Sequence, residues 1–183
     1  MGYAMQDERG PGQFAGGAET ERVGDGEWLY CRVLPAWNPP HYRLDGSRLE
    51  VLAQAFSQRA MPDGPYSGQY RLSMDRAMLC GADPSVTQRG GPNVAPSVIG
   101  VVRFQAGELR ALPDVADVEP EPVVGDPDLP DNPAHAAVCV RHTPGASKSS
   151  NKTPYENVRR ELAAIVNRDP SRWEIKPSAP LPS

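Results

Sequence analysis

The hydrophobic pattern of the chain consists of short apolar runs separated by Gly- and Pro-rich stretches, which favours strands over long helices. Residues 27–34 are dense in aromatic and aliphatic side chains and predict a first strand. Residues 97–104 predict a second strand. The alternation in residues 108–112 predicts a further strand. This strand would form a β-hairpin with residues 97–104, with Gly107 supplying a positive φ in the turn. The apolar run 136–141 is typical of a strand inside a sheet.

Apolar residues first recur at helical spacing between residues 45 and 59. Asp45 or Ser47 is a candidate N-cap, and turn chemistry after Arg59 would end the helix. One face of this helix would carry the apolar side chains Leu49, Leu52 and Phe56.

The segment after Thr153 gives the strongest helix signal of the chain. Thr153 is the expected N-cap, Pro154 occupies the first helical position, and Glu156 completes a capping box at the third. The helix should run to about Arg168, and its apolar side is formed by Tyr155, Val158, Leu162 and Ile165.

Weaker strand signals at residues 66–73 and 172–176 complete the pattern. The order of elements predicts an α+β fold, with a mainly antiparallel sheet of about five to six strands, two helices on one face and long Pro-rich loops. Residues 1–26 contain few aliphatic side chains and predict a disordered tail. Residues 27–177 should form a single α+β domain, and residues 178–183 a Pro-rich tail.

The charges of the chain are segregated along its length. The formal net charge is −4, yet residues 106–133 carry eight acids and one base, whereas residues 134–183 carry four acids and eight bases. Such a chain either folds its charged segments onto each other or offers two surfaces of opposite sign. Arginine greatly outnumbers lysine among the 19 basic residues, which indicates a GC-rich genome and a bacterial source.

The compartment is predicted from segments that the sequence lacks and from its cysteines. The sequence contains no run of about 18 apolar residues, so no membrane helix is predicted. The first residues have neither the basic nor the apolar region of a secretory signal. Cys31, Cys80 and Cys139 are widely spaced and form no CxxC pair, so we expect buried thiols in a reduced, cytoplasmic protein.

The loop before the second predicted helix, His142-Thr-Pro-Gly-Ala-Ser-Lys-Ser-Ser-Asn-Lys, offers hydroxyl and ammonium groups beside a helix N-terminus. Such a terminus attracts anions. A solvated flexible loop is the competing interpretation, because the phosphate-loop spacing G-x-x-x-x-G-K-[ST] is absent. The candidate anion-binding residues are Arg141, Lys148, Ser149, Lys152, Arg159 and Arg160.

Other candidate chemistry is weaker. His135, Cys139 and His142 offer three zinc-type ligands without an evident fourth, so no metal or cofactor is predicted. A polar residue that fixes the start of a strand through backbone bonds is the competing interpretation of His135. Cys80 before Gly81 is a conceivable nucleophile, but no G-x-S-x-G or H-E-x-x-H motif occurs, and no catalytic residue is assigned.

The charged segment that contains Arg71, Asp75 and Arg76 has two interpretations. The first is a buried Arg–Asp pair that stabilises the fold. The second is a docking surface or a ligand-binding arginine, because guanidinium groups suit carboxylates and phosphates.

These features predict a small non-catalytic accessory or adaptor protein of a bacterial multi-protein assembly. Residues 141–160 would contact a polyanion such as nucleic acid or phosphate, and the acidic residues 113–131 a basic protein partner. No membrane association is expected. The alternative is a small enzyme that acts on a phosphate-bearing compound such as a nucleotide, and a toxin or antitoxin partner is a third interpretation.

Overall fold

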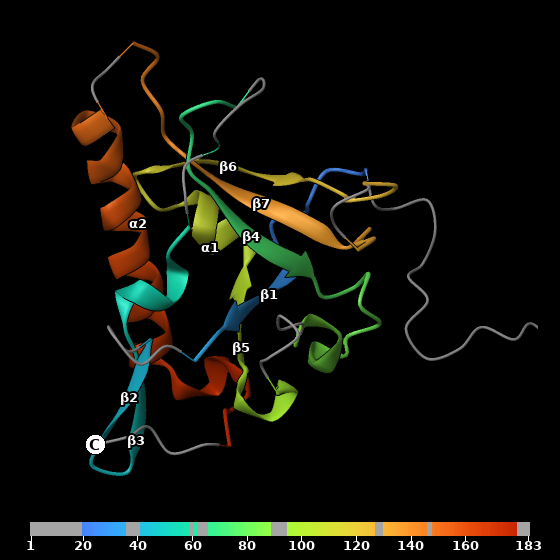
Figure 1. The fold of residues 1–183 in the computed structure, drawn as a ribbon, viewed down its shortest axis with the longest axis vertical. Coiled ribbons are helices and arrows are strands. Elements are labelled where there is room, and N and C mark those ends of the chain that lie inside the picture. The colour runs from blue at the N-terminus through green and yellow to red at the C-terminus, as the bar shows by residue number, and fades with distance from the viewer. Residues whose placement is uncertain are drawn as a thin grey trace, which may run out of the picture.

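A six-stranded antiparallel sheet forms the centre of the protein (Figure 1). The computed structural model describes residues 20–35, 41–58, 61, 66–88, 95–126, 130–145 and 148–178. The sheet has the spatial order β6-β7-β4-β1-β5-β8. Its strands are β1 (Trp28–Val33), β4 (Arg71–Arg76), β5 (Gly100–Gln105), β6 (Val115–Pro120), β7 (His135–Val140) and β8 (Trp173–Ile175).

The remaining elements surround this sheet. The short strands β2 (Tyr42–Asp45) and β3 (Arg48–Val51) pair with each other, and the helices are α1 (Ala106–Arg110) and α2 (Lys148–Arg168). Four 3₁₀ turns complete the described part: η1 (Ala53–Phe56), η2 (Pro84–Thr87), η3 (Pro96–Val98) and η4 (Pro170–Arg172). The predicted α+β class with a mainly antiparallel sheet is confirmed.

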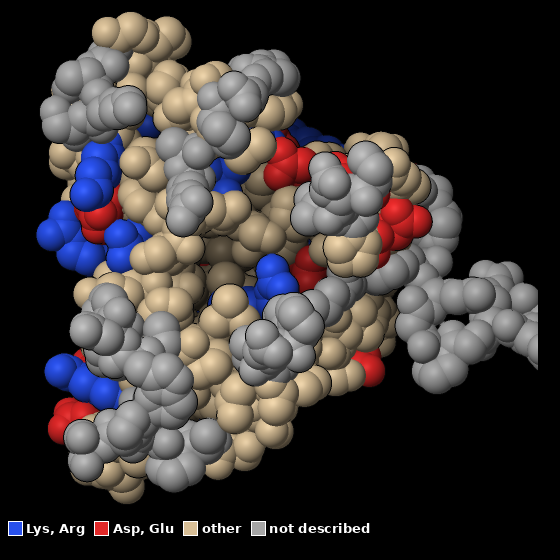
Figure 2. All heavy atoms as spheres, viewed as in Figure 1, with Lys and Arg blue, Asp and Glu red and all other residues tan. Residues whose placement is uncertain are grey.

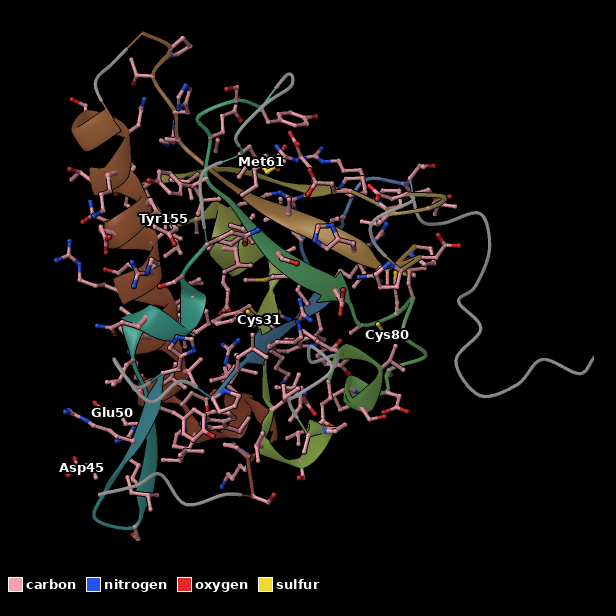
Figure 3. All side chains as sticks on the ribbon, viewed as in Figure 1. Cys31, Asp45, Glu50, Met61, Cys80 and Tyr155 are labelled. Carbon is pink, nitrogen blue, oxygen red and sulfur yellow. The ribbon has the colours of Figure 1, made fainter. Side chains whose placement is uncertain are left out.

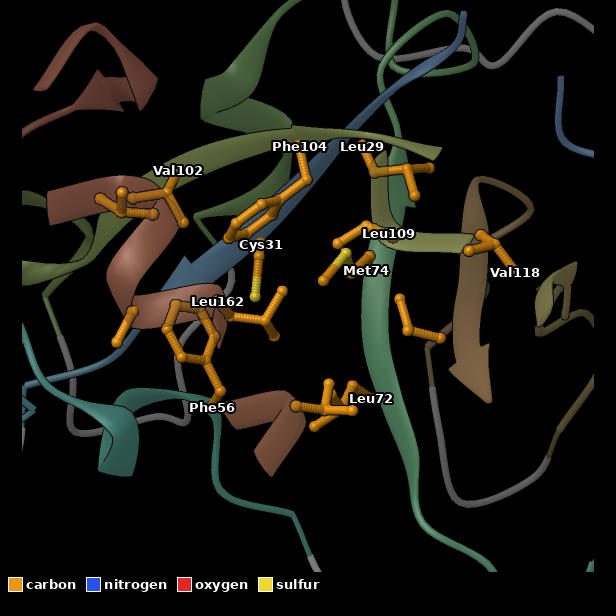
Figure 4. Close-up of a cluster of buried hydrophobic side chains, with 14 of the residues drawn as sticks. Leu29, Cys31, Phe56, Leu72, Met74, Val102, Phe104, Leu109, Val118 and Leu162 are labelled. Carbon is orange, nitrogen blue, oxygen red and sulfur yellow. The ribbon is translucent and has the colours of Figure 1, made fainter. Parts of the chain in front are cut away.

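The main core lies between one face of the sheet and α2 (Figure 4). Successive strand residues point to opposite faces, so each strand gives alternate side chains to this core. The contributing side chains include Leu29, Cys31, Leu72, Met74, Val102 and Phe104 from the sheet, Phe56 from η1, Leu109 from α1 and Leu162 from α2. Burial of each large apolar side chain stabilises the fold by about 1.5–3 kcal/mol.

The opposite face of the sheet is covered differently along its width. Over β1 and β5, Tyr30 and Val101 pack against Ala77, Leu79 and Cys80 from the segment after β4. Over β4, β7 and β6, the same face carries mostly polar side chains, which form the site described below.

A buried ion pair fixes the start of the described chain to the sheet. Arg76 is only 2% exposed and donates two hydrogen bonds to Glu27, at 2.8 and 3.0 Å, and a third to the carbonyl of Glu21 at 2.9 Å. Val23 is fully buried. Val23 and the carbonyl of Glu21 thus contact the domain within the segment predicted as a tail, and residues 1–19 of that segment lie outside the described part.

The helix predicted between residues 45 and 59 is wrong. These residues instead complete the β2–β3 hairpin and the turn η1. Gly46-Ser47 forms the two-residue turn of this hairpin, and Gly46 supplies the positive φ, +61°, that such turns require at their first position. Tyr42 and Val51 lie opposite each other and are both buried, which fixes the register.

The hairpin predicted around Gly107 is also wrong. The first strand is present as β5, but residues 106–110 form the helix α1, capped by reciprocal hydrogen bonds between Gln105 and Glu108. Gly107 instead allows close approach of the chain, since its N–H donates to the carbonyl of Asp25 at 2.8 Å. A Cβ atom at Gly107 would lie 3.0 Å from that oxygen.

The predicted C-terminal helix exists, but its predicted N-cap at Thr153 is wrong because α2 begins at Lys148 and contains Pro154. Asn151 supports the first turn through hydrogen bonds to the backbone N–H and C=O of Thr143, at 2.9 and 3.2 Å. The apolar face then docks this helix on the sheet, so that Pro154 removes one helical hydrogen bond without ending the helix.

The other strand predictions are largely confirmed. The strand expected at residues 66–73 begins later, as β4, and the strand expected at residues 172–176 is β8. The acidic segment provides the edge strand β6. Ser178 of the predicted tail donates to the carbonyl of Ser97, and residues 179–183 lie outside the described part.

The Arg76–Glu27 pair makes a prediction for stability. Arg76→Ala would leave a carboxylate that is only 10% exposed without its partner, so we expect a loss of about 3–5 kcal/mol in the free energy of unfolding. The matched control is Arg43→Ala, which breaks an exposed pair with Glu50 and should cost less than about 1 kcal/mol. Urea denaturation of both variants measures the difference, and equal losses would contradict a structural role for the buried pair.

Candidate functional site

The residues predicted to bind an anion are spread along α2 and the preceding loop. Arg141 is exposed, and its Nε donates to the carbonyl of Pro113 at 2.5 Å. Lys152 is exposed and lies 3.9 Å from Glu156 in the same helix. The side chains of Lys148 and Ser149 lie outside the described part of the structure.

The two arginines of this set have different environments. Arg159 is 9% exposed and donates to the carbonyl of Ala53 at 3.0 Å and to both oxygens of Glu156, so it joins α2 to η1. Arg160 is exposed and donates to Asn157 at 2.6 Å. Basic side chains gather along the edge of the molecule formed by α2, with an acidic side chain among them (Figure 2).

A more compact polar cluster lies on the opposite face of the sheet, over β4, β7 and β6. Its centre is Arg71, which is 4% exposed and donates to Glu119 at 2.8 Å and to Glu121 at 2.9 Å. The ring of Tyr66 lies 4.0 Å from the guanidinium carbon. Burial alone would lower the pKa of Arg71, but the hydrogen bond to Glu119 and the nearby carboxylates raise it, so this group stays charged.

The predicted burial of Arg71, Asp75 and Arg76 is confirmed, but they do not pair with one another as Arg–Asp. Asp75 instead accepts a hydrogen bond from the amide of Asn132 at 2.7 Å. Arg71 forms ion pairs with Glu119 and Glu121. Arg76 forms one with Glu27.

Beside Arg71, the side chains of Ser73 and His135 are in direct contact. Ser73 Oγ lies 2.7 Å from His135 Nε2, and His135 Nδ1 lies 2.8 Å from the backbone carbonyl of Glu121. A carbonyl oxygen only accepts hydrogen bonds, so Nδ1 carries the ring proton of the neutral imidazole. Nε2 therefore accepts the hydroxyl proton of Ser73, which is the arrangement that activates a serine nucleophile.

The charges around this pair favour a protonated intermediate. The carboxylate of Glu121 lies 3.6 Å from His135 Nδ1. Glu119 and Glu121 together carry two negative charges against the single positive charge of Arg71. The remaining negative charge would stabilise an imidazolium formed when His135 takes a proton.

The backbone bonds of His135 agree with the interpretation that it fixes the start of a strand, because its ring holds Glu121 against β7. The contact with Ser73 is additional. Neither Ser73 nor Glu121 was singled out from the sequence, since Ser73 lies within a strand and no local motif surrounds it.

The sheet opens next to Ser73. Strands β1 and β4 pair only at Leu29↔Arg76 and Tyr30↔Asp75, and beyond this point the side chain of Gln58 takes over, accepting the N–H of Ser73 at 3.1 Å. A cavity of about 130 Å³ fills the gap. Figure 2 shows a hollow near the centre of the view, and Figure 3 labels Cys31 in the middle of the same view.

The wall of the cavity combines apolar and polar groups. Cys31, Phe56 and Leu72 belong to the apolar part. The polar part includes Ser73, Gln58 and His41 and the charged residue Arg32. Burial lowers the pKa of His41, which favours its neutral form, and its Nδ1 lies 2.8 Å from the carbonyl of Leu34. Because that carbonyl only accepts, Nδ1 again carries the proton.

The prediction of buried cysteines is confirmed for Cys31, Cys80 and Cys139, all of which are free thiols. Burial raises the pKa of Cys31 and of Cys139 to about 12. A thiolate is the reactive form of cysteine, so these two residues are poor nucleophiles at neutral pH. Ser73 is therefore the better nucleophile candidate in this region.

In the described ranges, no group of three or more His, Cys, Asp or Glu side chains is arranged to hold a metal ion. The side chains of His135, Cys139 and His142, considered above as zinc ligands, therefore do not form such a group. The described helices include none with the length and apolar character needed to cross a membrane. Comparison of the chain with protein-family models, curated proteins and solved structures finds no significant match.

The raised pKa values make a prediction for thiol chemistry. At pH 8 only about one in ten thousand Cys31 or Cys139 groups is a thiolate, given a pKa of about 12. Iodoacetamide should therefore modify both slowly in the folded protein and rapidly in denaturant, as measured by peptide mass spectrometry. Unfolded thiols ionise near pH 9 and folded ones near pH 12, so the free energy of unfolding should fall across that interval. Rapid modification of both residues in the folded state would contradict this environment.

Proposed function

We propose that the protein is an enzyme that transfers or hydrolyses an acyl group through Ser73. The observation that supports this proposal is the 2.7 Å contact between Ser73 Oγ and His135 Nε2, with the opposite ring nitrogen held by Glu121. Nucleophile, base and orienting group are thus in hydrogen-bonding sequence.

The first step is attack of Ser73 Oγ on a substrate carbonyl carbon. His135 Nε2 accepts the hydroxyl proton as the new C–O bond forms, and the carbonyl π electrons move to its oxygen. The tetrahedral intermediate collapses, the leaving group takes the proton from His135, and an ester on Ser73 remains. Water then attacks this ester, again with His135 as base, and releases the acid and the free serine.

The negative oxygen of the intermediate needs a donor. Gln58 accepts the N–H of Ser73 through its amide oxygen, so its amide nitrogen is a donor group in the same cavity wall. We assign to Gln58 the stabilisation of this oxygen.

An acyl group suits this site better than a phosphoryl group. Arg71 is already shared by two carboxylates, and the cluster retains one net negative charge. A phosphate carrying two negative charges would be repelled, whereas a neutral ester or thioester would not.

A fluorophosphonate probe tests the proposal because it forms a covalent bond with activated serines. Wild-type protein should gain one adduct at Ser73, located by peptide mass spectrometry. Ser73→Ala should abolish this adduct, and His135→Gln should slow its formation about 1,000-fold, since the hydroxyl loses its base.

Ser85→Ala is the matched control, because Ser85 is exposed in η2 and lies outside the cluster. This variant should react like the wild type, and circular dichroism should show that all variants are folded. No adduct on the wild-type protein, or an adduct that survives in Ser73→Ala, would refute the proposed enzyme.

The second candidate is the accessory function expected from the sequence, with α2 as a contact surface for a polyanion. Lys152, Arg160 and Arg168 are exposed along this helix, which favours it. Arg159 is left out because it contacts η1 and Glu156. Three exposed bases would give weak, salt-dependent binding.

Heparin affinity chromatography and DNA gel shifts test this surface. Lys152→Glu with Arg160→Glu should reduce retention on heparin and remove any low-salt shift, because reversed charges repel phosphates and sulfates. The control with the same net charge is Arg22→Glu with Arg43→Glu, two exposed bases outside α2. Equal effects of the two double variants would refute a specific role for the helix.

A further inference from the structure

We infer, on the basis of the proposed function, that the cavity between β1 and β4 receives the acyl part of the substrate and selects short acyl chains. Ser73 belongs both to the wall of this cavity and to the contact with His135. An acyl group bonded to Ser73 therefore has the cavity as its neighbouring space.

The size of the cavity limits the chain. Its volume is about 130 Å³, slightly less than the roughly 150 Å³ of a protein cavity that binds benzene. A chain of about four carbons fits such a space, whereas one of eight carbons would extend past it.

Part of the wall is apolar and suits a hydrocarbon chain. Phe56 and Leu72 are buried core residues that also belong to this wall, and Cys31 adds an apolar sulfur. The Cys31 thiol stays protonated at neutral pH because burial raises its pKa to about 12. Burial also lowers the pKa of His41 and favours its neutral form. Arg32 also belongs to the wall, so the wall chemistry does not by itself select between an uncharged and an anionic chain.

Two residues allow the size of the cavity to be changed. Ala55 belongs to the wall, so Ala55→Leu would fill part of the space. Leu34 also belongs to the wall but is 37% exposed, so Leu34→Ala would enlarge the cavity at little cost in stability. Met78 is 57% exposed and lies outside this wall, which makes Met78→Ala a matched control for truncation of an apolar side chain.

The experiment measures kcat/KM of full-length protein for p-nitrophenyl acetate, butyrate and octanoate, with fluorophosphonate labelling of Ser73 in parallel. We expect butyrate to exceed octanoate at least tenfold in the wild type. Ala55→Leu should lower the butyrate value about tenfold with little effect on acetate. Leu34→Ala should reduce the preference for butyrate over octanoate, and Met78→Ala should leave the profile unchanged.

The outcomes separate this inference from the function on which it rests. If Ser73 is labelled and the esters turn over, but the profile is flat or insensitive to Ala55→Leu and Leu34→Ala, the acyl-pocket assignment is wrong and the serine enzyme stands. If no ester is hydrolysed in a Ser73-dependent manner, both proposals are wrong.

Discussion

The hydrogen bonds of Arg71 to Glu119 and Glu121 hold the polar half of the sheet together. Arg71 belongs to β4, whereas both carboxylates come from β6 and its C-terminal end, so the guanidinium reaches across the width of β7. A nearly buried guanidinium without these partners would be strongly destabilising. The same contacts place Glu121 where its carbonyl meets His135. The orientation of the imidazole, and hence its contact with Ser73, follows from this one shared arginine.

Ion pairs within the fold explain part of the charge segregation along the sequence. The acidic segment that contains β6 supplies carboxylates to arginines of the sheet and of α1, rather than to the bases of α2. Asp117 accepts a hydrogen bond from Arg110 at 2.7 Å, and this bond holds the pKa of Asp117 below its ordinary value. Arg110 also donates to the carbonyl of Val118, which occupies part of the free edge of β6. Such contacts protect an edge strand from pairing with other chains.

The parts of the fold that the sequence predicted are those with strong local patterns. The apolar runs of β1, β5 and β7 and the amphipathic face of α2 were recognisable from side-chain order alone. The errors arose where two local signals compete. Gly46-Ser47 is a hairpin turn within a stretch that also has helical spacing, and the Gln105–Glu108 capping box stands within an alternating pattern. In each case, packing against the sheet decided between the two signals.

The candidate site could not be predicted because it is assembled from distant residues. Ser73 and His135 are 62 positions apart, and their contact depends on the register between β4 and β7. A shift of that register by one residue would move one of them to the other face. Only His135 was considered from the sequence, as a residue that fixes the start of a strand or, less favoured, as one of three zinc-type ligands with Cys139 and His142. The partner that matters chemically lies on another strand.

The short ladder between β1 and β4 divides the sheet into two three-stranded leaves, β6-β7-β4 and β1-β5-β8. The β1–β5, β4–β7 and β6–β7 ladders each contain five or six residue pairs, whereas the seam relies on two residue pairs and the amide of Gln58. Each main-chain hydrogen bond absent from the seam forgoes about 0.5–1.5 kcal/mol. The seam is thus where a small molecule can enter the sheet without displacing a strand.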